Sequence, residues 1–110
     1  MATRARTITD LIDALSDLPG LSSRRMFGEY ALYLGTKVVA LVCDDVLYVK
    51  PTPGALALVR DPVMAPPYPG AKNYIRLESA LDAPELVMAT LRAVAGDTPE
   101  PKPKTPRKKA

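Results

Sequence analysis

The amino-acid sequence predicts an α+β fold: a two-layer α/β sandwich with a mainly antiparallel sheet and the element order α-β-β-β-α-(β)β-α. Apolar residues recur at helical spacing near both ends of the chain, whereas residues 24–50 consist of short apolar segments separated by two-residue turns. A length of 110 residues with 47% hydrophobic and 25% charged residues is that of one ordinary globular domain. These patterns together predict helices packed against a single sheet.

The first predicted element is an amphipathic helix. Its apolar residues recur at i, i+3, i+4 and i+7: Ile8, Leu11, Ile12 and Leu15. We expect Thr7 to cap its N-terminus, or Thr3 if the helix begins earlier, because a hydroxyl oxygen accepts a bond from an unpaired helical N–H. Pro19-Gly20 predicts where the helix has ended.

A β-meander is predicted next. Residues 25–34 alternate as one strand, and Gly35-Thr36 suits a type II′ turn with glycine first. Residues 38–43 are apolar on both faces, which predicts a central strand covered on both sides or buried in an interface. Asp44-Asp45 forms the next turn, and residues 46–50 form the third strand. Within the first strand, one face is expected to carry Tyr30, Leu32 and Leu34 and the other Glu29, Ala31 and Tyr33.

The second half returns to helices. Thr52 followed by proline predicts the start of a short helix over residues 54–60. Residues 62–72 are proline-rich and irregular, and residues 73–77 form a strand. The last helix opens near residues 82–85, and its apolar stripe is Val87, Met88, Leu91, Val94 and Ala95.

The charge of the chain lies in its C-terminal segment. Residues 1–96 hold ten basic and ten acidic residues, whereas residues 97–110 hold five basic and two acidic ones, a net charge of +3. Gly96 is the predicted helix C-cap and the end of the folded domain (residues 1–96). Residues 97–110 also carry four of the twelve prolines and are predicted to be disordered. Weak, non-specific nucleic-acid binding is expected of five of them, with a merely solubilising tail as the alternative: Lys102, Lys104, Arg107, Lys108 and Lys109.

Several function classes are excluded by composition. The chain has no histidine, so it lacks the usual general base and zinc ligand, and we expect neither an enzyme nor a bound cofactor or metal. Cys43 is the only cysteine and is expected to be an inert buried thiol. No apolar run approaches the ~20 residues that cross a bilayer, and no leader opens the chain. We therefore expect a cytoplasmic protein with no membrane partner.

One segment resembles a known family. The string Arg25-Met26-Phe27-Gly28, followed by Tyr30, Leu32-Tyr33, Leu47-Tyr48 and Lys50, is similar to the N-terminal domain of the TfoX/Sxy competence regulators. The resemblance covers about residues 5–95. It implies a fold like that of secretion chaperones, a role in regulating DNA uptake or transcription, and no established catalytic residues.

The resulting hypothesis is a non-enzymatic regulatory domain that binds another protein through residues 26–50. The candidate contact residues are Arg24, Arg25, Phe27, Tyr30, Tyr48 and Lys50. Each has a structural alternative, since aromatic side chains more often pack in a core and arginines before a strand more often lie at a solvated edge. Nucleic-acid binding through the basic tail is the alternative function, and homodimer formation is left open.

Overall fold

The computed structural model describes residues 3–26, 28–78 and 80–99 of the chain. Its elements in chain order are α1 (Ala5–Ala14), β1 (Leu21–Met26), β2 (Glu29–Leu34), β3 (Lys37–Cys43), β4 (Val46–Val49), α2 (Pro53–Leu58), β5 (Val63–Ala65), β6 (Tyr74–Leu77), the 3₁₀ helix η1 (Ala80–Asp82) and α3 (Pro84–Asp97). The predicted α+β class is confirmed.

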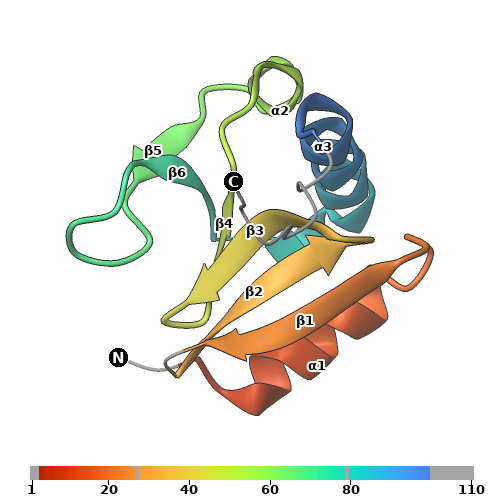
Figure 1. Ribbon diagram of the computed structural model, residues 1–110, viewed down its shortest axis with the longest axis vertical. Coiled ribbons are helices and arrows are strands. Elements are labelled where there is room, and N and C mark those ends of the chain that lie inside the picture. Colours follow the sequence, from red (N-terminus) through yellow and green to blue (C-terminus); the bar gives the residue numbers. More distant parts are fainter. Residues whose placement is uncertain (1–2, 27, 79, 100–110) are drawn as a thin grey trace, which may run out of the picture.

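The six strands form one antiparallel sheet in the spatial order β1-β2-β3-β4-β6-β5 (Figure 1). Every neighbouring pair is antiparallel, and β1 and β5 are the two edges. β3 lies inside the sheet and is buried on both faces, as its continuous apolar sequence predicts. Its register with β2 shifts after Leu32, so that Val39 is an extra residue in a β-bulge.

The helices pack on one face of this sheet and enclose the main core. In Figure 1, β1 passes in front of α1, while α2 and α3 lie side by side at the top and upper right. The core joins residues from α1 and α3 to one face of the strands, and its largest fully buried side chains include Leu15, Leu32, Leu47, Ile75 and Leu91. Burying such side chains stabilises the fold by about 1.5–3 kcal/mol each.

The opposite face of the sheet carries a second, smaller apolar cluster. Ala31, Leu41, Cys43 and Tyr48 are buried there, with Tyr33 and Tyr74 partly buried beside them. The predicted alternation in β2 is correct, because Ala31 and Tyr33 belong to this cluster whereas Tyr30 and Leu34 pack against the main core.

The prediction of one strand over residues 25–34 is wrong, because the chain reverses within it. Met26 pairs with Glu29 across a tight turn, and Gly28 there has a φ of +81°, a left-handed conformation that favours glycine. The sequence does not predict β1, because residues 22–26 are all exposed and show no apolar alternation. β5 is a short strand within residues 62–72, which the sequence predicts to be irregular, and it corresponds to the bracketed strand of the predicted element order.

The turn predictions agree better with the structure. Gly35 has a φ of +65°, which suits the first position of a type II′ turn. Asp44 and Asp45 both have positive φ, at 53° and 63°, as the central residues of a type I′ turn do. Thr52 caps α2 as predicted, since its hydroxyl accepts from the N–H of Ala55 at 3.3 Å.

Two predicted helix ends are wrong. Gly96 is not a C-cap: α3 continues through Asp97, and Thr98 is its C-cap. At the other end of the chain, neither Thr3 nor Thr7 caps α1, whose N-cap is Arg4 without a side-chain cap bond of its own. Both threonines instead bond to residues far along the chain, as described below.

Candidate interaction groove

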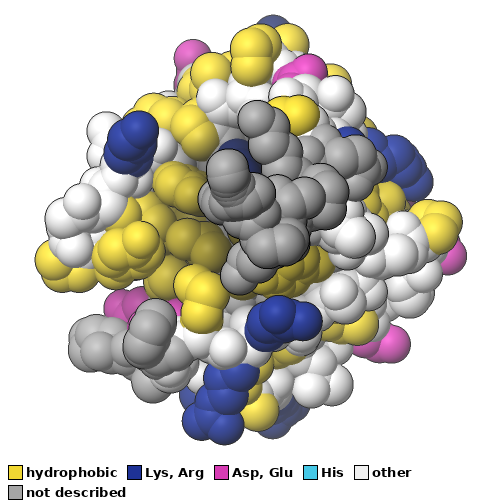
Figure 2. Space-filling view, in the orientation of Figure 1, with side chains coloured by type: hydrophobic (Ala, Val, Ile, Leu, Met, Phe, Trp, Pro, Cys, Tyr) yellow, Lys and Arg dark blue, Asp and Glu magenta, His cyan; other side chains and the backbone are white. Residues whose placement is uncertain are grey.

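A hollow of about 770 Å³ lies on the helix-free face of the sheet, and we call it the apolar groove. It is lined by Met26, Glu29, Tyr30, Leu41, Cys43, Asp44, Tyr48 and residues 66–69. Figure 2 shows hydrophobic side chains gathered in a hollow on this side of the molecule. This concave, mainly apolar surface is the candidate interaction site of the domain.

Strand pairing builds the floor of the groove. Leu41 and Tyr48 lie opposite each other in neighbouring strands, and Cys43 follows two residues after Leu41 on the same face. All three side chains are buried. The floor is therefore rigid, because each of these residues is fixed by the backbone hydrogen bonds of β3 and β4.

The segment between β5 and β6 forms one wall of the groove. Its sequence is Pro66-Pro67-Tyr68-Pro69, in which Pro67 is buried and anchors the wall while Tyr68 remains 53% exposed. Prolines fix φ near −65° and so limit the conformations of this wall. Tyr68 offers an aromatic ring to solvent beside an apolar floor.

Two carboxylates, Glu29 and Asp44, stand at the other side. Glu29 Oε1 accepts from the Thr3 hydroxyl at 2.6 Å and from the Asp44 N–H at 3.1 Å. The Thr3 N–H donates to the Gly28 carbonyl at 3.1 Å, which ties the N-terminal segment to the β1–β2 turn. These bonds position Glu29 and leave the groove lined by two acidic residues and no basic residue within the described part of the chain.

Asp45 connects the β3–β4 turn to the start of α1. Its Oδ1 accepts from the Arg4 N–H at 2.9 Å and from the Thr7 hydroxyl at 2.7 Å. The Arg4 Nε also lies 3.3 Å from Asp45 Oδ2. The Thr7 and Arg4 hydrogen bonds lower the pKa of Asp45 below its ordinary value of 3.8. The turn beside the groove thus holds the start of α1.

Cys43 is chemically quiet in this setting. Burial raises the pKa of its thiol from 9.0 to about 11, and the Glu29 and Asp44 carboxylates add to the shift. Burial also raises the pKa of Tyr74, with Tyr68 and Cys43 contributing. Within residues 3–26, 28–78 and 80–99, no three His, Cys, Asp or Glu side chains gather closely enough to hold a metal ion.

Comparison with known proteins identifies the domain that carries this groove. The family model described as the TfoX N-terminal domain matches residues 13–95, which include the floor and the proline wall. The chain belongs to this family. An uncharacterized 12.7 kDa protein in the trpE 5′ region of Spirochaeta aurantia is 35% identical over 109 residues, covering 99% of this chain and 95% of that protein. No solved structure matches.

The family motif contributes to both faces of the sheet. Tyr48 lies in the groove floor, whereas Tyr30 only borders the groove and packs against the main core. Arg24 stacks over the Tyr33 ring, 5.5 Å from its centroid, on the face of the groove. Arg25 pairs with Tyr30 in the strand register and therefore points to the opposite face. Lys50 is half-buried just beyond β4.

The six predicted contact residues of this TfoX-family domain are thus not one surface. Phe27 lies outside the described residues, as do the five predicted nucleic-acid contacts Lys102, Lys104, Arg107, Lys108 and Lys109. From the sequence, no contact residue is assigned to the proline wall, which is placed in an irregular connection. The aromatic residue set among three prolines was the signal that could have identified it.

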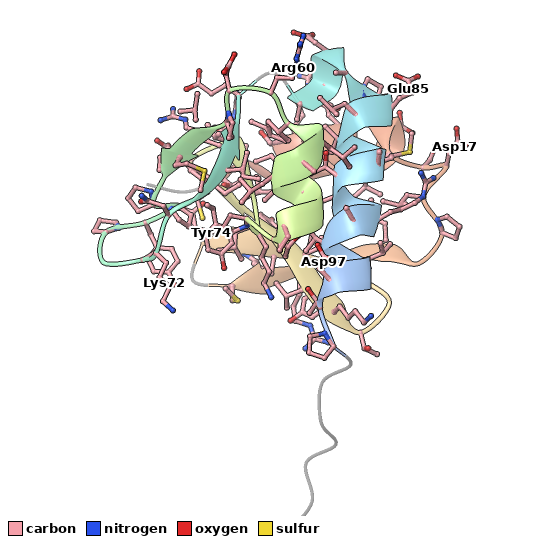
Figure 3. The ribbon with its side chains drawn as sticks, turned by 90° about the horizontal axis from the view of Figure 1, so that it is seen from above. Asp17, Arg60, Lys72, Tyr74, Glu85 and Asp97 are labelled. Carbon is pink, nitrogen blue, oxygen red and sulfur yellow. The ribbon has the colours of Figure 1, made fainter. Side chains whose placement is uncertain are left out.

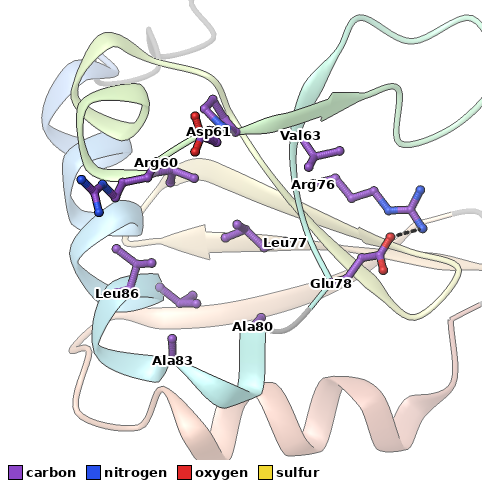
Figure 4. A pocket seen from close by; sticks show the side chains of 12 residues that line it. Arg60, Asp61, Val63, Arg76, Leu77, Glu78, Ala80, Ala83 and Leu86 are labelled. Atoms are coloured by element: carbon purple, nitrogen blue, oxygen red, sulfur yellow. Dashed lines mark ion pairs between the residues drawn. The ribbon is translucent and has the colours of Figure 1, made fainter.

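A second hollow, of about 480 Å³, lies between α3 and the β5–β6 edge of the sheet (Figure 4). Leu86 and Val63 are exposed along it, and Arg76 forms an ion pair with Glu78 at 2.8 Å. Arg60 is exposed at its border.

The described helices include none that is long and apolar enough to cross a membrane.

Proposed function

We propose that this TfoX-family domain is a non-enzymatic protein-interaction module that holds an apolar segment of a partner protein in the apolar groove. The observation that carries the proposal is the groove itself, with a rigid floor of Leu41, Cys43 and Tyr48 and an exposed aromatic ring at Tyr68. Exposed aromatic side chains beside buried apolar floors are typical anchor points in protein interfaces.

The chemistry of the groove supports binding over catalysis. Its one nucleophilic side chain, Cys43, has a pKa of about 11 and therefore carries almost no thiolate at neutral pH. The chain has no histidine to remove a proton from it. Membership of the TfoX N-terminal family supports a regulatory role, in DNA-uptake competence or transcription, carried out in the cytoplasm.

Site-specific crosslinking tests the proposal. A photoreactive phenylalanine replaces Tyr68 in the groove wall or, as a matched control, Leu81, which is 50% exposed and lies outside the groove. We expect crosslinks from position 68 to a discrete protein in nuclease-treated cells, and none to that protein from position 81. The same pattern from both positions, or a product that nuclease removes, would contradict it.

Nucleic-acid binding is a second candidate, favoured by one observation. The whole net charge of +3 lies in residues 97–110, while residues 1–96 are balanced. Clustered cations attract the phosphate backbone without reading sequence.

A further inference from the structure

We propose that the apolar groove binds the chain's own proline-rich segment, residues 99–110, in cis, so that a partner must displace this segment to enter. This inference rests on the proposed function, because it assigns regulation to the same groove. It rests on three features: the chemistry of the groove lining, its charge, and the position at which α3 ends.

The groove lining suits a polyproline II segment. Such segments bind to grooves lined by aromatic and apolar side chains, and they lose little entropy because their conformation is already restricted. Tyr48 in the floor and Tyr68 in the wall supply two such rings, and Met26, 39% exposed, supplies a flexible apolar contact. Residues 99–110 read PEPKPKTPRKKA, with prolines at 99, 101, 103 and 106.

Charge favours the same occupant. Glu29 and Asp44 line the groove, and no lysine or arginine among the described residues does. Residues 99–110 carry five basic side chains against a single acidic one, that of Glu100. A basic proline-rich segment therefore matches both the apolar floor and the acidic side of the groove.

The end of α3 lies within reach of the groove. Lys37 Nζ donates to the Ala95 carbonyl at 2.8 Å, which fixes the last turn of α3 at the start of β3. From there Cys43 is six residues along the strand, about 20 Å at ~3.3 Å per residue. The eleven residues from 100 to 110 span about 34 Å in a polyproline II conformation at ~3.1 Å per residue, so about the first six cover the distance to Cys43 and residues 106–110 remain to contact it.

Binding in cis follows from effective concentration. A segment joined to the domain by a short linker experiences an effective concentration on the order of millimolar. A contact too weak to hold two separate molecules together therefore fills the groove within one molecule. An external partner competes with the tethered segment. The apparent association constant of the partner is therefore its intrinsic value multiplied by the fraction of chains whose groove is empty.

Paramagnetic NMR on the full chain tests this directly. A nitroxide on Thr105→Cys labels the segment selectively, since buried Cys43 reacts poorly with thiol reagents. We expect strong loss of amide signal at Leu41, Tyr48 and Tyr68 and little at Thr9 and Asp10, which are exposed on α1. A matched chain carries the same nitroxide with Pro101, Pro103 and Pro106 replaced by serine, and its groove signals should recover.

A mixing experiment separates binding in cis from binding between molecules. An isotope-labelled chain without nitroxide is mixed with an unlabelled chain that carries it, and we expect no signal loss at the groove. Loss in the mixed sample only, equal loss at groove and α1, no loss at all, or loss unchanged by the serine substitutions would each overturn the inference.

Crosslinking at position 68 keeps the two proposals distinguishable. The serine-substituted chain should yield more partner crosslink than the parent chain, because its groove is free. A partner crosslink without nitroxide effects overturns the tail contact alone. Nitroxide effects without any partner crosslink from either chain overturn the proposed function alone.

Discussion

Cys43 shows how a residue's surroundings determine its chemistry. Its thiol pKa of about 11 leaves roughly one hundredth of the thiolate that an unperturbed cysteine would carry at pH 8. We expect iodoacetamide to modify the folded chain at least about 100-fold more slowly than the chain in denaturant, since the thiolate is the nucleophile. Mass spectrometry over time measures both rates. Similar rates would show an accessible, reactive thiol.

Asp45 should make the stability of the fold depend on pH, because its carboxylate holds the start of α1. Because its folded pKa lies below 3.8, its contribution to stability is present above that value and is lost as pH falls through the folded pKa. We expect Asp45→Asn to lower the melting temperature at pH 7 and to flatten its fall below about pH 4. Asparagine tolerates the left-handed φ of 63°, so the turn is kept.

The matched control for Asp45 is Asp17→Asn, a change at an exposed carboxylate beyond the end of α1 (Figure 3). Thermal melts of the three chains between pH 2 and pH 7 make the comparison. The control should keep the acid dependence of the parent. If Asp45→Asn keeps it as well, the network around the start of α1 does not stabilise the fold through charge.

At the scale of elements, the contact between α2 and α3 depends on a glycine. Figure 3 shows Asp97 at the end of α3 beside α2, and its Oδ2 accepts from the Gly54 N–H at 2.7 Å. A Cβ at position 54 would lie 2.7 Å from that oxygen and 3.2 Å from the Ala93 Cβ. At Gly96, a Cβ would meet nothing within 4 Å.

The same substitution should therefore have opposite effects at these two glycines. Gly96→Ala replaces a glycine in the last turn of α3, in open space, and should raise the free energy of unfolding by about 0.5 kcal/mol, the low end of the value for a glycine in mid-helix. Gly54→Ala breaks the bond to Asp97 and should lower it by about 1 kcal/mol. Urea denaturation measures both. Equal effects would mean that α2 moves aside freely.

Most elements could be predicted from local patterns, and the exceptions have physical causes. The sequence predicts α1, β3 and α3 because each of them buries one stripe or one run of apolar residues. β1 does not, since an exposed edge strand gives no apolar alternation. The end of α3 was misplaced because a glycine in open space need not stop a helix; here Asp97 continues α3 and bonds to Gly54.

The groove was only partly predictable, for a reason of distance along the chain. The motif points to Tyr48, but the wall opposite comes from residues 66–69, some twenty positions later. Sequence spacing does not show that β6 returns beside β4, and so does not show that these prolines face Leu41 and Cys43. The bond from the Arg4 N–H to Asp45 could not be predicted for the same reason, because the two residues lie 41 positions apart.

At the scale of the whole molecule, charge and fold are separate. The main core is closed by residues up to Val94, whereas the excess charge lies at Lys102, Lys104, Arg107, Lys108 and Lys109. Changes to these five residues should therefore alter electrostatic binding while leaving the main core intact.

Because the excess charge lies outside the folded domain, binding to duplex DNA should depend on these five basic residues. Five cations that each neutralise one phosphate give a log–log salt slope of about −4.5, with Kd on the order of 10⁻⁴–10⁻⁶ M and no sequence preference. Replacing all five with glutamine in the full chain should abolish this binding, because residues 1–96 carry no net charge. Fluorescence anisotropy across a salt series measures it. Sequence-selective, salt-resistant binding by the glutamine variant would instead place DNA recognition on the folded domain.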